Sequence, residues 1–97
     1  MKVFLSHKMT GLTEKEVMKI RKDALDYLQS KYGEIELIDN YNHINVPTNA
    51  GRLWHLGASI QLMEKADVIY FCPGWIFASG CVIEHHICFM YKLNVIK

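Results

Sequence analysis

The sequence carries almost no net charge and lacks a hydrophobic run long enough to cross a membrane. Its 11 Lys and Arg side chains nearly balance 10 Asp and Glu, which leaves a formal net charge of +1. Such a balance provides no long-range attraction to nucleic acid or anionic lipid. The uncharged stretch from Val68 to Ile83 is broken by Pro73-Gly74 and Ser79-Gly80, and it is shorter than the roughly 20 apolar residues of a membrane helix. We therefore expect neither a nucleic acid nor a membrane as a partner.

Cysteine is also scarce, and its count is odd. The 3 cysteines, Cys72, Cys81 and Cys88, cannot all pair within one chain. Met1-Lys2 leads directly into an apolar segment, so we predict no secretory leader. Free thiols and the expected absence of a leader together predict a cytoplasmic protein.

The residues that are present fit one globular domain over residues 1–97, with 51% hydrophobic and 22% charged side chains. Apolar spacing predicts strands at 2–6, 35–38, 67–72 and 94–97, and helices at 13–33, 52–66 and 79–92. Thr13 and Glu16 form a capping box at the start of the first helix, and Gly33 is its predicted C-terminal cap. In the second helix we expect an inward-facing row made of Leu53, Leu56, Ile60 and Met63.

This alternation of strands and helices predicts the α/β class, with a mostly parallel sheet and helices on both faces. In such sheets, ligands bind outside the carboxyl ends of the strands. Three loops reach that edge, at residues 7–12, 39–51 and 73–80. We therefore predict the functional site there.

Glu84 is the main candidate for chemistry at this edge. It lies one turn after Gly80, at the start of the last helix, and helical side chains lean back toward the N-terminus. Glycine leaves space beside the carboxylate, and the helix dipole favours its ionised form. An ionised carboxylate with open space before it is able to attack a sugar carbon. The alternative is that Glu84 only complements the helix dipole and faces water.

Other residues suggest weaker hypotheses. Cys81, His85 and Cys88 have helical spacing, but three ligands from one short helix rarely surround an ion, so we predict no metal and no other cofactor. Four side chains in or near the long polar stretch either form a wall that stacks on a base or pack as ordinary loop residues. These are Tyr41, His43, Trp54 and His55.

Several motifs together resemble the nucleoside 2-deoxyribosyltransferase-like superfamily, in particular its short bacterial and phage branch. The segment KVFLSHKMTGL, from Lys2 to Leu12, resembles the branch's strand followed by Ser-Gly-Pro-Met-Thr-Gly. The run from Leu62 to Glu84 resembles its strand, Pro-Gly-Trp loop, Ser-Gly turn and helical Glu. The ending from Tyr91 to Ile96 resembles its last helix and strand. The resemblance covers nearly the whole chain and is weakest over 39–57.

The resemblance implies a flavodoxin-like three-layer sandwich with a short four-stranded sheet. It also implies an enzyme that cleaves or transfers at the N-glycosidic bond of a nucleoside or nucleotide, with Glu84 as the nucleophile. By the same analogy, five residues would bind the substrate. They are Ser6, Met9, Trp75, Ser79 and Gly80, where Trp75 either stacks on a base or plugs its loop and Ser79 either caps the helix or touches the ligand.

Four residues depart from the pattern of the superfamily. His7-Lys8 replaces the usual Gly-Pro, Ala78 replaces an Asp, and Ser59 replaces an acidic residue of the middle helix. These departures favour an alternative function, a catalytically inactive module of the same fold that binds or sequesters a nucleotide.

The last helix is apolar nearly all round, which predicts a contact with a second subunit. Its apolar residues are Val82, Ile83, Ile87, Cys88, Phe89, Met90 and Tyr91. Relatives in the superfamily also assemble, often with a neighbour completing each site. We therefore predict a homodimer or a larger homo-oligomer.

Overall fold

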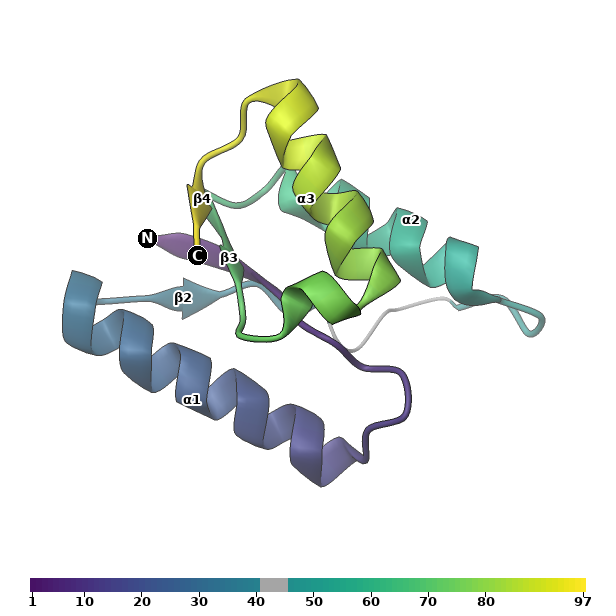
Figure 1. Cartoon of the computed structure of the whole chain (residues 1–97), viewed down its shortest axis with the longest axis horizontal. Coiled ribbons are helices and arrows are strands. Elements are labelled where there is room, and N and C mark those ends of the chain that lie inside the picture. The colour runs from purple at the N-terminus through teal and green to yellow at the C-terminus, as the bar shows by residue number, and fades with distance from the viewer. Residues whose placement is uncertain (41–45) are drawn as a thin grey trace.

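Four parallel strands form a sheet with helices on both faces in the computed structural model, which describes residues 1–40 and 46–97 (Figure 1). The elements follow in the order β1 (Lys2–Ser6), α1 (Glu14–Tyr32), β2 (Glu36–Leu37), α2 (Arg52–Met63), β3 (Val68–Phe71), a 3₁₀ turn η1 (Trp75–Phe77), α3 (Ser79–Tyr91) and β4 (Val95–Ile96). The strand order is β2-β1-β3-β4, and every pair is parallel. This parallel α/β arrangement is the one that the alternation of strands and helices predicts, and it is consistent with the flavodoxin-like fold that the resemblance implies.

The alternating side chains of β1 divide the core into two layers. Val3 and Leu5 pack with α1 on one face, whereas Phe4 packs with Met63 of α2 and Cys88 of α3 on the other. In Figure 1, α1 accordingly lies on one side of the sheet, and α2 and α3 lie on the opposite side. By this alternation Ser6 faces the α2 and α3 layer, which determines its role in the site.

The predicted helix boundaries of α1 are confirmed in detail. The Thr13 hydroxyl accepts a hydrogen bond from the Glu16 amide, and the Glu16 carboxylate accepts one from the Thr13 amide. Gly33 has a φ of 85°, which a residue with a side chain rarely adopts, and its amide donates to the Gln29 carbonyl. These contacts satisfy backbone groups at both ends of the helix.

The second helix begins at Arg52, as predicted, but it differs from the prediction at its C-terminal end and in the orientation of one residue of its first turn. It ends at Met63 rather than Ala66, because the following amides of Lys65 and Ala66 bond three residues back, in tighter turns. Leu53 was expected to face inward, but its side chain is 81% exposed. That prediction is wrong, since the first turn of α2 lines an open cleft instead of packing on the sheet.

In the described part of the chain, no helix combines the length and the apolar character needed to span a membrane.

Candidate active site

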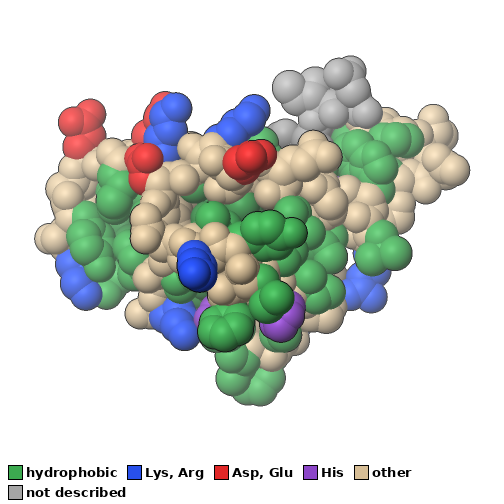
Figure 2. Space-filling model, turned by 90° about the horizontal axis from the view of Figure 1, so that it is seen from above, with side chains coloured by type: hydrophobic (Ala, Val, Ile, Leu, Met, Phe, Trp, Pro, Cys, Tyr) green, Lys and Arg blue, Asp and Glu red, His purple; other side chains and the backbone are tan. Residues whose placement is uncertain are grey.

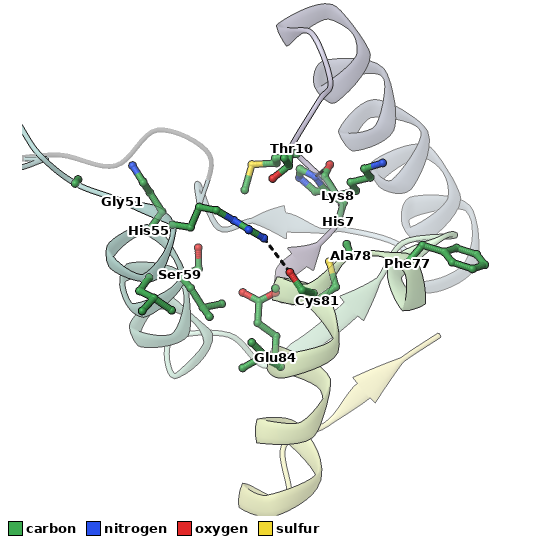
Figure 3. Close-up of a pocket in the computed structure, with 18 residues that line it drawn as sticks. His7, Lys8, Thr10, Gly51, His55, Ser59, Phe77, Ala78, Cys81 and Glu84 are labelled. Carbon is green, nitrogen blue, oxygen red and sulfur yellow. Dashed lines mark hydrogen bonds between the residues drawn. The ribbon is translucent and has the colours of Figure 1, made fainter.

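A cleft of about 1080 Å³ opens at the carboxyl ends of β1 and β3 (Figure 3). The strand order changes direction between these two strands, because β2 lies beyond β1 on one side and β3 and β4 lie on the other. Such a switch point separates the loops that follow adjacent strands and leaves a crevice between them. The loop after β1, the first turns of α2 and the start of α3 form its walls. This is the edge where the sequence predicts a functional site.

Glu84 lines the cleft and is only 6% exposed. Its Oε1 accepts a hydrogen bond from the Ser6 hydroxyl, at 2.7 Å between the two oxygen atoms. Ser6 ends β1 and is itself buried, so the rigid sheet fixes the orientation of the carboxylate. Among the described residues, no hydrogen bond to Oε2 is found, which leaves this oxygen available for a ligand.

Burial raises the pKa of Glu84 from an ordinary value of 4.5 to about 7, and the hydrogen bond from Ser6 lowers it by less. The position of Glu84 near a helix N-terminus predicts an ionised group, whereas its burial favours the protonated form. The helix dipole has little influence here, because Glu84 lies in the second turn of α3 and the dipole effect fades within the first turn. The carboxylate is therefore easily switched between its two forms near neutral pH.

Replacing Ser6 by Ala should raise the pKa of Glu84 further, by about one unit, because a hydrogen bond to a charged group is worth roughly 1.5–3 kcal/mol. Titration of the Glu84 carboxyl carbon by NMR measures this shift directly. Ser30→Ala, which removes an exposed hydroxyl of α1, is the matched control. An unchanged Glu84 titration in Ser6→Ala would show that the hydroxyl does not stabilise the ionised form.

Ser79 and Gly80 also line the cleft, at the N-terminus of α3. The N-cap residue is Ala78, which has no side chain to cap the helix, and the Ser79 hydroxyl instead accepts a hydrogen bond from Arg52 Nη2 at 3.0 Å. The alternative in which Ser79 caps the helix is therefore wrong. A Cβ at Gly80 would lie 3.8 Å from Leu56 Cδ1, which is an ordinary contact, so glycine widens the cleft here without being required by the fold.

Of the remaining predicted site residues, Met9 lines the cleft and Trp75 does not. The indole ring of Trp75 stacks on His85 with 4.4 Å between ring centroids, and it packs at 5.2 Å from the ring of Phe71. This position favours the interpretation that Trp75 plugs its loop. Stacking on a base in the cleft is not supported, because the ring lies outside the cleft lining and packs against Phe71 of β3 and His85 of α3.

A largely buried polar network, which no sequence pattern indicates, holds the loop after β1. Arg21 of α1 donates to the Asn40 side chain at 2.9 Å and to the Ile38 carbonyl at 3.2 Å, and its Nη1 lies 3.2 Å from His7 Nε2. Since guanidinium groups only donate, Nε2 accepts, and His7 Nδ1 donates to the Lys8 carbonyl. Burial and the charge of Arg21 both lower the pKa of His7, whereas the bond to Lys8 raises it. His7 is thus a neutral side chain whose hydrogen bonds fix the position of Lys8 and the residues after it.

Positive charge outweighs negative charge along the cleft. Lys8 and Arg52 line it, and Glu84 is the sole carboxylate among the described lining residues. Ala78 and Ser59 also line it, as do His7 and Lys8, so all the residues that depart from the superfamily pattern face this space. Within ranges 1–40 and 46–97, no three His, Cys, Asp or Glu side chains are arranged to hold a metal ion. Tyr41 and His43, the possible stacking residues of the long loop, lie outside the described residues.

Comparison with known proteins gives one family. The family model described as "Domain of unknown function (DUF4406)" matches residues 1–97. No curated protein and no solved structure matches the chain at a significant level. The description of the family assigns no activity, so a function has to be argued from the cleft itself.

Proposed function

We infer that this chain, which belongs to the DUF4406 family, cleaves or transfers at the N-glycosidic bond of a nucleoside or nucleotide, with Glu84 as the nucleophile. The observation that carries this proposal is the buried Glu84 carboxylate, anchored by Ser6 through one oxygen and facing the cleft with the other. The resemblance to the nucleoside 2-deoxyribosyltransferase-like superfamily adds the substrate class. A carboxylate that served only the helix dipole would need no cleft before it.

The proposed reaction has two steps. Ionised Glu84 attacks the anomeric carbon, the bond between this carbon and the base nitrogen breaks, and the base leaves with the bonding electrons and takes a proton from water. A glycosyl ester on Glu84 results, and either water or the nitrogen of a second base attacks the same carbon and restores the carboxylate. Water as the acceptor gives a hydrolase, and a base gives a transferase. The raised pKa of about 7 means that activity should increase with pH until Glu84 is fully ionised.

The charges around the cleft favour substrates with a phosphate. Lys8 lies on the loop after β1, and Arg52 opens α2 and bonds Ser79 at the N-terminus of α3. The first amides of α3 have no acceptor within the helix, because its first bond runs from the Val82 amide to the Ala78 carbonyl. Nucleoside monophosphates should therefore bind more tightly than the corresponding nucleosides.

Incubation with a panel of nucleosides and their 5′-monophosphates tests the proposal, with free base measured by liquid chromatography. The panel should contain ribose and deoxyribose forms of each common base, with and without a second base as acceptor. We expect base release by the wild-type protein from at least one member. Absence of base release from every member would overturn the proposed enzyme.

One observation favours the binding module as a second candidate. Retaining glycosidases commonly use two carboxylates, and here Glu84 alone lines the described part of the cleft, with Ala78 and Ser59 at the other two positions. A nucleotide that raises the melting temperature of the protein without releasing base would support this function. Release of base at a steady rate would exclude it.

We also propose that a second copy of the chain packs on the outer face of α3. Large apolar side chains are exposed there, including Phe89 at 74%, and Phe77 is 82% exposed at the edge of the cleft. Figure 2, which views the molecule from the α3 side of Figure 1, shows hydrophobic side chains grouped on this face. Exposed apolar surface that borders a ligand cleft is well suited to a subunit that closes the cleft.

Phe89→Glu should convert this assembly to a monomer, because a carboxylate placed in an apolar interface remains unpaired. Light scattering after size-exclusion chromatography measures the mass in solution. Lys22→Glu, on the exposed side of α1, is a control that should keep the wild-type mass. A wild-type protein that is already a strict monomer at micromolar concentration would contradict the proposed assembly.

A further inference from the structure

Ser59 is a buried serine on the wall of the cleft. It lies in the middle of α2, it is 5% exposed, and it lines the cleft. In the part of the chain that the structure describes, its hydroxyl makes no hydrogen bond, although all other buried polar side chains on that edge are bonded. A buried hydroxyl without a partner destabilises a fold, and such groups are rare. The open space in front of Ser59 therefore indicates a partner that comes with the ligand.

Ser59 and Glu84 approach the cleft from opposite walls. Figure 3 shows the Ser59 hydroxyl on α2 and the Glu84 carboxylate on α3 reaching into the same space. Because Ser6 occupies Oε1, the reacting oxygen of Glu84 is Oε2. When the reacting carbon of a ligand lies at Oε2, the neighbouring atoms of that ligand lie between Glu84 on α3 and Ser59 on α2.

The stereochemistry of the proposed reaction identifies these atoms. A nucleophile that displaces the base of a β-nucleoside approaches the anomeric carbon from the face opposite the base. In ribose, the 2′-hydroxyl lies on that same face, on the adjacent carbon, and in 2′-deoxyribose it is absent. Hydrogen bonds to this hydroxyl strengthen in the transition state of glycoside cleavage.

Resting on the proposed function, we propose that Ser59 is a specificity-determining residue that binds the 2′-hydroxyl of the sugar and makes the site selective for ribose over 2′-deoxyribose. Serine both donates and accepts, as the 2′-hydroxyl does, so the two groups satisfy each other. A carboxylate at this position would face Glu84 and oppose its ionisation. A neutral hydroxyl avoids that repulsion while still binding the sugar.

The test compares matched ribose and deoxyribose nucleotides in the wild-type and Ser59→Ala proteins. We expect the wild-type kcat/KM to favour the ribose form by at least about 10-fold, since a site built for a hydroxyl discriminates against its absence. Ser59→Ala should reduce this ratio to near one, mainly by loss on the ribose form. The melting temperature of Ser59→Ala should not fall, because the lost hydroxyl makes no hydrogen bond to any residue that the structure describes. Gln61→Ala, exposed on the same helix, should keep the wild-type ratio.

Binding in the Glu84→Gln background provides a second readout that does not require turnover. Calorimetry should give a dissociation constant for the ribose nucleotide about 10-fold lower than for the deoxyribose form, and the added Ser59→Ala change should remove the difference. Wild-type preference for deoxyribose, or equal ratios in wild type and Ser59→Ala, would overturn the role of Ser59 and leave the proposed enzyme intact. If the wild type neither binds nor cleaves either series, both proposals fail.

Discussion

Glu84→Gln should lower the rate of base release by at least about 10³-fold, because the amide is a poor nucleophile and cannot form the glycosyl ester. The substitution preserves the shape of the side chain and allows the Ser6 hydroxyl to donate to the amide oxygen as it does to Oε1. Substrate binding should therefore remain measurable in the variant. Loss of turnover with retained binding is the pattern expected for a residue that acts chemically.

His86→Ala is the matched control for this experiment, because His86 is exposed on the same helix and does not line the cleft. Its rate of base release should stay within about 2-fold of wild type, since surface substitutions away from a site have small effects. Both rates are measured by chromatography of the free base at pH 8, where wild-type Glu84 is mostly ionised. Full activity of Glu84→Gln would show that another group is the nucleophile.

Glu84→Gln should also raise the free energy of unfolding above pH 7. Glu84 has a pKa of about 7 when folded, against an ordinary 4.5 when unfolded. Below pH 4.5 the group is neutral in both states and contributes no difference. Between these values the unfolded chain ionises while the folded chain keeps its proton, so wild-type stability falls as pH rises. Above pH 7 both states are ionised, and the wild-type free energy of unfolding is then lower by about 3 kcal/mol than below pH 4.5.

Glutamine has no charge to bury. The free energy of unfolding of Glu84→Gln should therefore exceed that of wild type by up to about 3 kcal/mol at pH 8, and by almost nothing at pH 4. Urea unfolding at both values measures the free energy of unfolding. Glu64→Gln, at the exposed C-terminus of α2, should show no comparable gain. If Glu84→Gln were less stable than wild type at pH 8, the carboxylate would be a structural group rather than a functional one held at a cost in stability.

The fold follows closely from local sequence signals. The predicted bounds of β1 are those observed, and the capping box of Thr13 and Glu16 and the terminal Gly33 delimit α1. These features depend on neighbours in the sequence, which is why they are readable without a structure. The sequence predicts only a loop where the 3₁₀ turn Trp75–Phe77 lies, because a single turn of helix leaves no periodic pattern.

The sequence predicts where the site lies, but it predicts only part of the contacts between its side chains. Spacing and resemblance bring Glu84, Met9, Ser79 and Gly80 to one cleft, as the structure places them. The bond between Ser6 and Glu84 joins residues 78 positions apart, so no local pattern reveals it. The raised pKa of Glu84 arises from three-dimensional burial. Trp75 packs on His85 because β3 and α3 converge, and that convergence is tertiary as well.

The polar network around Arg21 shows what kind of signal was missed. Arg21 lies among exposed charged residues of α1, yet its side chain reaches Asn40 and His7 at the end of the sheet. Asn40 in turn donates to the Leu5 carbonyl, so three segments are joined at the base of the loop after β1. A histidine in place of the usual glycine at position 7 was the available clue, because a buried ring needs partners.

The most direct test of the account is to trap the sugar on the protein. The probe is a 2′-fluoro analogue of a nucleotide that the protein cleaves, because the fluorine slows breakdown of the covalent intermediate. Mass spectrometry of the digested protein then locates the added mass. We expect one glycosyl group on the peptide that contains Glu84, and none in Glu84→Gln. Release of base by the wild type with the sugar attached elsewhere, or with equal labelling of Glu84→Gln, would contradict Glu84 as the nucleophile.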